Sequence, residues 1–111
     1  MLKKKAQSTI NIILGEKSVA CGKFESEGSI DIYGMFDGEL SAKKNVVIGK
    51  GATVKGKICA SNVYIYGKVE ADISATKSVT VASGASLIGN IECKYITIDK
   101  GGAHKGNCFI V

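Results

Sequence analysis

The sequence VVIGKGATVKGKI at residues 46–58 contains the pattern that decides the fold. Its apolar side chains alternate with polar or variable ones, first at Val46 and Ile48 and again at Val54 and Ile58. A period of two is what an extended strand requires, because successive side chains point to opposite faces. Glycines separate the alternating segments, as is typical of tight turns. The stretch therefore predicts short strands joined at glycine-containing corners.

The same pattern recurs along almost the whole chain. Copies of the motif in which two apolar residues flank a variable one begin at Ile12, Ile30, Val46, Val63, Val79 and Ile96. The steps between these copies are 18, 16, 17, 16 and 17 residues. Such a repeat cannot bury its apolar face alone and must stack on its neighbours. The absence of proline agrees with stacked strands, because interior strands need every backbone N–H group.

A small residue repeats in phase with this motif. It is Gly22, Gly38, Gly56, Ala71, Gly89 and Gly106 in the successive copies. The residues two positions before and two positions after it form further columns, which are apolar except at His104. We therefore expect an all-β fold, a single-domain parallel β-helix (β-solenoid) with about six triangular rungs of 16–18 residues.

The corner after each motif has one of two lengths. It connects the last apolar residue of the motif, such as Ile48, to the apolar residue two positions before the small residue, such as Val54. In the copies that begin at Ile30 and Val63, these two residues are four positions apart, whereas in the other copies they are six positions apart. We expect the corner glycines to adopt left-handed backbone conformations. Gly34 and Gly67 match across the two short corners, and we expect alanine to be most harmful there.

Composition and charge exclude several classes of protein. The chain has 111 residues and 45% hydrophobic residues, which suits one domain, and it contains no apolar run long enough for a transmembrane helix. Its cysteines, at positions 21, 59, 93 and 108, lack CxxC spacing, so we expect reduced thiols, no metal and a cytoplasmic location. All 15 basic residues are lysines, and there is no phosphate-binding loop, so neither nucleic acid nor nucleotide nor any other cofactor is expected.

Residues 1–8 are expected to form a flexible amino-terminal tail. The tail contains Met1, Leu2, Lys3, Lys4 and Lys5. The first two side chains can enter a membrane interface, while each lysine gains on the order of 1 kcal/mol near anionic lipid. We therefore predict that these five residues bind the membrane. The alternative is that the lysines only keep the tail soluble.

The ends of the expected β-helix, at residues 9–108, lack a recognisable cap. An uncapped solenoid exposes an unpaired strand and a section of its core at each end. We expect these ends, including the apolar end at residues 109–111, to join copies of the chain into filaments. The alternative is that residues 109–111 fold back over their own core. The predicted polymer-interface residues are Ile10, Ile12, Ile13, Leu14, His104, Phe109, Ile110 and Val111.

Three segments resemble the bactofilins, which are bacterial cytoskeletal proteins that form filaments. The segments are GSIDIYGMFDGEL at 28–40, VVIGKGATVKGKICA at 46–60 and VYIYGKVEA at 63–71. The resemblance implies a right-handed coil and non-polar filaments that assemble without nucleotide through the helix ends. It also implies attachment to the cytoplasmic face of the inner membrane and a scaffold role in cell shape or in the positioning of cell-envelope or cell-wall enzymes.

Other solenoid proteins are enzymes or bind ligands. A hexapeptide-repeat acyltransferase uses a histidine at a subunit boundary, but His104 aligns with the apolar residues Val54 and Leu87. A carbohydrate-acting solenoid needs clustered carboxylates, whereas Glu39 and Asp72 fall two rungs apart in one column. We therefore expect a protein that is not an enzyme. The alternative is a hexapeptide-repeat-like acyltransferase or a ligand-binding β-solenoid.

Overall fold

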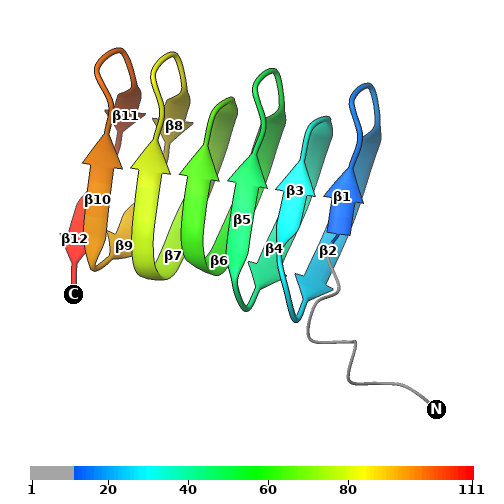
Figure 1. The fold of residues 1–111 in the computed structure, drawn as a ribbon, viewed down its shortest axis with the longest axis horizontal. Helices are drawn as coiled ribbons and strands as arrows, with labels where there is room; N and C mark the ends of the chain where they lie inside the picture. Colours follow the sequence, from blue (N-terminus) through cyan, green and yellow to red (C-terminus); the bar gives the residue numbers. More distant parts are fainter. Residues whose placement is uncertain (1–11) are drawn as a thin grey trace.

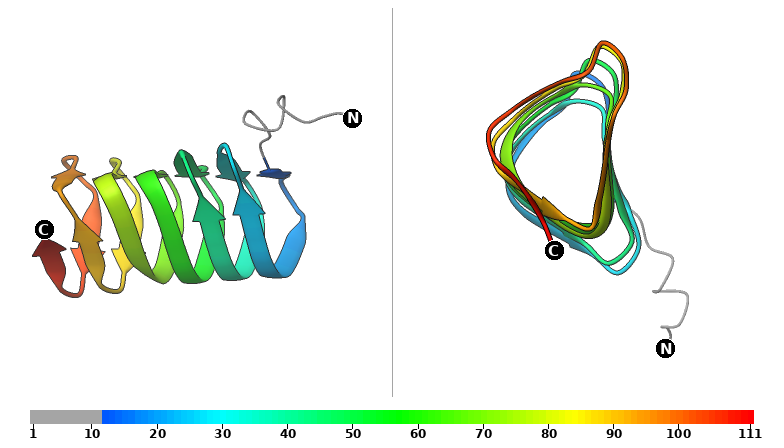
Figure 2. Two further views of the ribbon diagram at one scale, coloured as in Figure 1. Left: turned by 90° about the horizontal axis from the view of Figure 1, so that it is seen from below. Right: turned by 90° about the vertical axis from the view of Figure 1, so that its left-hand side faces the viewer.

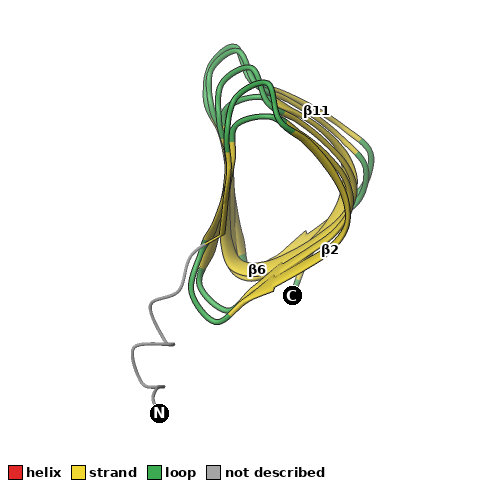
Figure 3. Cartoon of the chain, turned by 90° about the vertical axis from the view of Figure 1, so that its right-hand side faces the viewer, coloured by secondary structure: helices red, strands yellow, loops and turns green. Residues whose placement is uncertain are grey.

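Parallel strands are stacked along one axis in the computed structural model, which describes residues 12–111 (Figure 1). Twelve strands form one sheet that coils on itself, and residues 12–111 contain no helix. The strands are β1 (Ile12–Leu14), β2 (Val19–Ser26), β3 (Ile30–Ile32), β4 (Met35–Ala42), β5 (Asn45–Ile48), β6 (Thr53–Ile65), β7 (Lys68–Val81), β8 (Ser86–Ile88), β9 (Ile91–Cys93), β10 (Tyr95–Ile98), β11 (Ala103–Lys105) and β12 (Cys108–Ile110). Seen along its axis, the coil is triangular (Figures 2 and 3). It is right-handed, because the front strands in Figure 1 run upward while the chain advances from right to left. The predicted β-helix is confirmed.

Equivalent residues of successive rungs are hydrogen-bonded neighbours. The first apolar column pairs in the order Ile12, Ile30, Val46, Val63, Val79 and Ile96, which defines six rungs. A column on the second side of the triangle pairs in the same order from Ala20 to His104. The sequence alignment of the copies is therefore also the hydrogen-bonding register.

Burial follows the alternation that the sequence predicts. Along β7, the side chains of Val69, Ala71 and Ile73 are buried, while those of the residues between them are exposed. Burying one large aliphatic side chain stabilises a fold by about 1.5–3 kcal/mol relative to leaving it exposed. Near the amino-terminal end the core is aromatic, because the ring centroids of Phe24 and Phe36 lie 4.7 Å apart. The core is one continuous column of apolar side chains along the axis.

The small-residue column forms a corner that requires glycine for two reasons. Its five glycines have φ angles between 116° and 140°, which side-chain-bearing residues rarely adopt. In addition, a Cβ atom on Gly56 would collide with the carbonyl oxygen of Gly38 in the preceding rung. Ala71 occupies the same column without a positive φ. The local backbone therefore differs in the rung that carries the alanine.

Gly34 and Gly67 are required for a different reason from the one predicted. Neither has a positive φ, so the expected left-handed conformation is wrong at both short corners. Space is the constraint instead, because a Cβ atom on Gly67 would lie 2.5 Å from the carbonyl oxygens of Gly49 and Ala52. The short corner packs directly against the backbone of the longer corner in the preceding rung.

Residues with a left-handed backbone conformation do occur, in the long corners. Lys17, Gly51, Gly84 and Gly101 occupy equivalent positions and have φ angles of 64°, 86°, 83° and 91°. Each is the third residue of a four-residue turn, such as the one that Ala52 N closes by donating to Gly49 O at 3.0 Å. This geometry is that of a type II turn, which favours glycine at the third position.

Polar side chains form two short ladders parallel to the axis. In the first, Asn62 Nδ2 donates to Asn45 Oδ1 at 3.1 Å, and Ser78 Oγ donates to Asn62 Oδ1 at 2.8 Å. In the second, the backbone N–H of Asn90 donates to Asp72 Oδ1, and that of Asn107 donates to Asn90 Oδ1, both at 3.1 Å. These bonds join side chains to the adjacent rung and support the register at two corners.

Replacing Gly56 by alanine should destabilise the fold more than the same change at Gly22. Both residues have a positive φ, which costs an alanine about 1–2 kcal/mol. A Cβ atom at Gly22 meets nothing within 4 Å, whereas at Gly56 it meets backbone. Overpacking should add about 1–3 kcal/mol at Gly56. Urea unfolding of the two variants measures the difference, and equal midpoints would show that the contact between rungs is unimportant.

Candidate assembly surfaces

The first and last rungs contain strands that are paired on one side only. At the amino-terminal end, β1 pairs with β3 alone and β2 with β4 alone. At the carboxy-terminal end, β10, β11 and β12 each pair with one strand of the preceding rung. Within residues 12–111, each end therefore presents backbone groups that an interior rung would pair.

Core side chains are incompletely covered at the amino-terminal end. Ile12, Leu14, Ala20 and Phe24 point into the core but are only half-buried, because residues 12–111 provide no rung on their other side. Ile13 differs, since it pairs with Asp31 in an outward column and is 65% exposed. The structure therefore places Ile12 and Leu14 on the end face and Ile13 on the side of the rod.

The carboxy-terminal end is equally open. Ile96 is half-buried and Ile98 is 44% exposed, although the equivalent residues of interior rungs are buried. Cys108 belongs to the same inward column as Ile91 and is exposed. These three side chains form an apolar face across the end of the rod.

The last residues of the chain extend the final rung. Phe109, Ile110 and Val111 are 53%, 59% and 69% exposed, and β12 runs beside β9. They therefore do not fold back over the core. Ile110 aligns with the inward-pointing Cys93, whereas Phe109 aligns with Glu92 and points outward from the side. Of these two, Ile110 is the one that lies on the end face.

His104 is the last member of a column that is otherwise apolar. It aligns with Leu87, is half-buried, and its Nε2 atom lies 3.0 Å from the carbonyl oxygen of Gly89. This hydrogen bond joins the final rung to the preceding one. A role of His104 in packing at the end face stays a prediction.

The cysteines are unpaired thiols in different environments. Cys21 and Cys108 are exposed, Cys59 is half-buried and Cys93 is fully buried. Burial, followed by the neighbouring Cys108 thiol, raises the pKa of the Cys93 thiol above its ordinary value. Cys93 therefore stays protonated at neutral pH and acts as a small core residue.

Sequence reasoning found part of the end faces and missed the rest. The missed members are Ala20, Phe24, Ile96, Ile98 and Cys108. Their signal was present, since each is the first or last residue of an apolar column. The predicted interface residue Ile10 and the predicted membrane-binding residues Met1, Leu2, Lys3, Lys4 and Lys5 lie outside the described residues.

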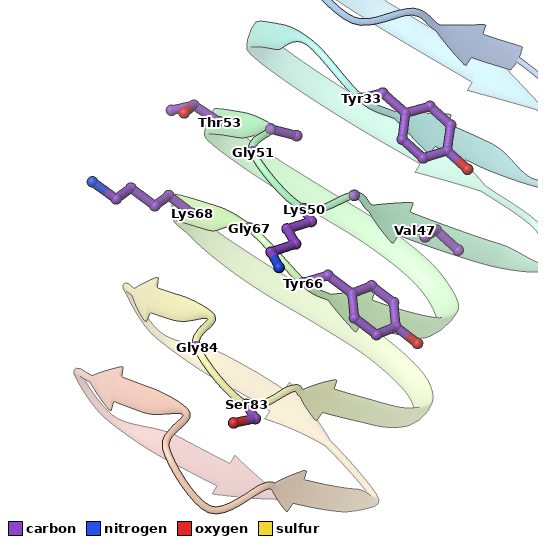
Figure 4. A pocket seen from close by; sticks show the side chains of 12 residues that line it. Tyr33, Val47, Lys50, Gly51, Thr53, Tyr66, Gly67, Lys68, Ser83 and Gly84 are labelled. Carbon is purple, nitrogen blue, oxygen red and sulfur yellow. The ribbon is translucent and has the colours of Figure 1, made fainter.

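A surface recess lies over a short corner, between the longer corners of the adjacent rungs (Figure 4). Its side chains include Tyr33 and Tyr66, with Lys50 on the corner between them. The Tyr33 ring covers Gly49, where a Cβ atom would collide with it. The residues that line the recess include no carboxylate or histidine. Its titratable side chains are those of Tyr33, Lys50, Tyr66 and Lys68.

Within residues 12–111, no group of three histidine, cysteine, aspartate or glutamate side chains is arranged to hold a metal ion. No helix in the same range is long and apolar enough to cross a membrane.

Comparison with known families matches residues 12–109 to the bactofilins, described as polymer-forming cytoskeletal proteins. No curated protein and no solved structure matches the chain. The family match confirms the resemblance seen in the three segments between residues 28 and 71. It extends that resemblance to both end rungs.

Changing Ile98 to lysine should prevent end contacts without unfolding the rod. The side chain is 44% exposed, so the free subunit can accommodate a charge there. Burying an unpaired charge in an end contact costs about 3 kcal/mol or more, which raises the concentration needed for assembly on the order of 100-fold. Sedimentation and electron microscopy measure this shift.

Ile88→Lys is the matched control, because Ile88 is 47% exposed but lies on the side of the rod. It should leave assembly unchanged. If both variants assemble like the unmodified protein, the carboxy-terminal face is not a contact.

Proposed function

Because the chain belongs to the bactofilin family of polymer-forming cytoskeletal proteins, we propose that it is a non-enzymatic scaffold whose rods join end to end into filaments. The incomplete cover of the core at the two end rungs is the observation that supports this proposal most strongly. Assembly needs no nucleotide in this proposal, because it is driven by apolar burial and backbone pairing.

Both driving forces act at the same surface. Ile12, Leu14 and Phe24 at one end, and Ile96 and Ile98 at the other, are core side chains that a further rung would cover. Covering them removes apolar surface from water, at roughly 25 cal/mol for each Å². The strands at the same ends can pair with strands of another copy, which satisfies their free backbone groups.

The proposed cellular role combines filament formation with membrane attachment. The segment Met1 to Lys5 contains two apolar residues and three lysines, a composition that favours an anionic membrane surface. A single segment of this kind binds weakly, but many copies on one filament bind with avidity. We place the filaments at the cytoplasmic face of the inner membrane. There they would support cell shape or position cell-envelope and cell-wall enzymes.

Electron microscopy of the purified protein, without nucleotide or metal, should show long thin filaments. Thiol labelling then locates the contact. Cys108 lies on the end face and Cys59 on the side of the rod at its middle. Filament formation should slow labelling of Cys108 by about tenfold or more, since a covered thiol reacts only when the contact opens. Cys59 should label at the same rate in both states, and equally fast labelling of Cys108 in filaments and in free subunits would contradict an end contact at this face.

Deleting residues 1–5 should weaken binding to anionic vesicles while leaving filaments intact. Three lysines contribute roughly 1 kcal/mol each near anionic lipid, so the loss should be on the order of 100-fold. Co-sedimentation with vesicles measures binding, and electron microscopy checks that filaments persist. Unchanged vesicle binding by the shortened chain would show that these residues are not an anchor.

A further inference from the structure

Four exposed lysines line one of the three edges of the rod. They are Lys43, Lys44, Lys77 and Lys94, and they lie at the corner where the chain passes from the third side of one rung to the first side of the next. Figure 3 shows this corner at the lower left, where β1 begins. We call these four residues the basic edge.

Backbone hydrogen bonds hold the basic edge together from rung to rung. Lys44 N donates to Gly28 O, Ser61 N donates to Lys44 O, and Lys94 N donates to Lys77 O, each at 3.0 Å. Between these pairs the register shifts, because Ala60 pairs with Ala75 but Asn62 pairs with Ser78. Thr76 and Lys77 together face Ser61, so this β-bulge inserts an extra residue at the corner. The corner backbone is therefore paired from rung to rung, with Ser61 in the rung between Lys44 and Lys77.

The net positive charge of the described residues is concentrated on this edge. Residues 12–111 contain twelve lysines and ten acidic residues. The basic edge has four of those lysines and one acid, Glu27, whose Oε1 lies 3.2 Å from Lys43 Nζ. The remaining eight lysines are outnumbered by nine acids. The rest of residues 12–111 therefore carries a net charge of −1.

An exposed aromatic residue adjoins the charges. Tyr95 follows Lys94, is 71% exposed and occupies the outer column of Asn62 and Ser78. Tyrosine is favoured at membrane surfaces, where its ring meets the apolar region and its hydroxyl stays hydrated. Lysines near it can place their stems along the same boundary while their ammonium groups contact lipid headgroups.

We propose that the basic edge is a second membrane-contact surface, which lies along an anionic lipid bilayer with the axis of the rod parallel to it. This proposal deepens the membrane attachment proposed above and rests on it. Ile12 enters β1 at the same edge, where its N–H donates to Ser29 O at 3.0 Å, so the residues before it are connected to the rod on the membrane side. One edge parallel to the axis gives every rung the same distance from the lipid.

Anionic lipid fits this surface better than nucleic acid. The lysines lie at one corner of the coil, and the chain contains no arginine, so bidentate contacts to phosphate or guanine are unavailable. Lysine acts as a mobile point charge, which suits a fluid layer of headgroups. Tyr95 alone is too little for a platform on which successive bases stack.

The test compares two variants of the full chain that lose the same charge. One changes the four lysines of the basic edge to glutamine. The other changes Lys17, Lys50, Lys68 and Lys100, which are exposed residues at or beside the opposite corner. Both retain residues 1–5. Binding is measured by co-sedimentation with vesicles of phosphatidylcholine containing phosphatidylglycerol, and with phosphatidylcholine alone.

The basic-edge variant should bind the anionic vesicles at least about tenfold more weakly than the unmodified chain, and the control variant should change little. Unchanged binding by the basic-edge variant overturns the proposal, as does an equal loss in both variants. If the basic-edge variant instead loses binding to duplex DNA and keeps vesicle binding, the surface is for nucleic acid and the proposal is wrong. Each variant is also checked for filament formation. This check distinguishes a loss of assembly from a loss of lipid contact at the basic edge.

A second measurement does not depend on removing charge. The chain contains no tryptophan, so a Tyr95→Trp variant places a single fluorescent reporter beside the basic edge. Its emission should shift to shorter wavelength with anionic vesicles. Tyr66→Trp, at a 47% exposed position in the recess, should show no shift. Equal shifts at both positions would overturn the proposed orientation.

Discussion

Hydrogen-bonded parallel strands lie about 4.8 Å apart, and the whole rod depends on this spacing. At such a distance, the nearest neighbour of a side chain is its equivalent in the next rung, as Val46 is to Ile30 and Val63. The same distance leaves no space for a Cβ atom between Gly38 and Gly56. It also lets Asn62 bond both Asn45 and Ser78. Packing, backbone conformation and polar ladders all follow from one repeat distance.

The spacing also explains why the ends differ from the middle. An interior side chain such as Val63 is covered from both directions along the axis and is completely buried. Ile12 and Ile96, in the same column, have a described neighbour on one side only and are half-buried. The ends therefore have the same chemistry as the core but lack half of its contacts. A second copy offers the matching chemistry because it has the same columns.

The sequence predicted the fold well because the repeat is visible residue by residue. Apolar columns, corner lengths and register could all be read from the spacing, since one residue of each rung occupies each column. The reason why glycine is required at Gly34 and Gly67 could not be predicted from the sequence. It depends on how closely a short corner approaches the long corner beside it. The outward orientation of Phe109 could have been predicted, because Cys108 before it belongs to an apolar column and successive side chains alternate. The pairing of Phe109 with Glu92 shows this orientation.

The basic edge illustrates a similar limit. Lys77 and Lys94 are 17 positions apart and become neighbours only when the rungs are stacked. Lys44 lies 33 positions before Lys77, with Ser61 in the rung between them. Lys3, Lys4 and Lys5 account for three of the five net positive charges, and the sequence alone does not show where the other two lie. The coil shows that the remaining excess is not spread evenly over the surface.

The half-covered end rungs have a thermodynamic consequence. In a one-dimensional stack, stability is approximately the sum of the rungs and the interfaces between them, and the terminal rungs contribute one interface each. A contact that covers an end adds an interface of the kind that already holds the subunit together. Assembly and folding then draw on the same free energy, so thermal stability should rise with protein concentration. For such a rod, the melting temperature belongs to the polymer and its concentration, and no single value describes the chain.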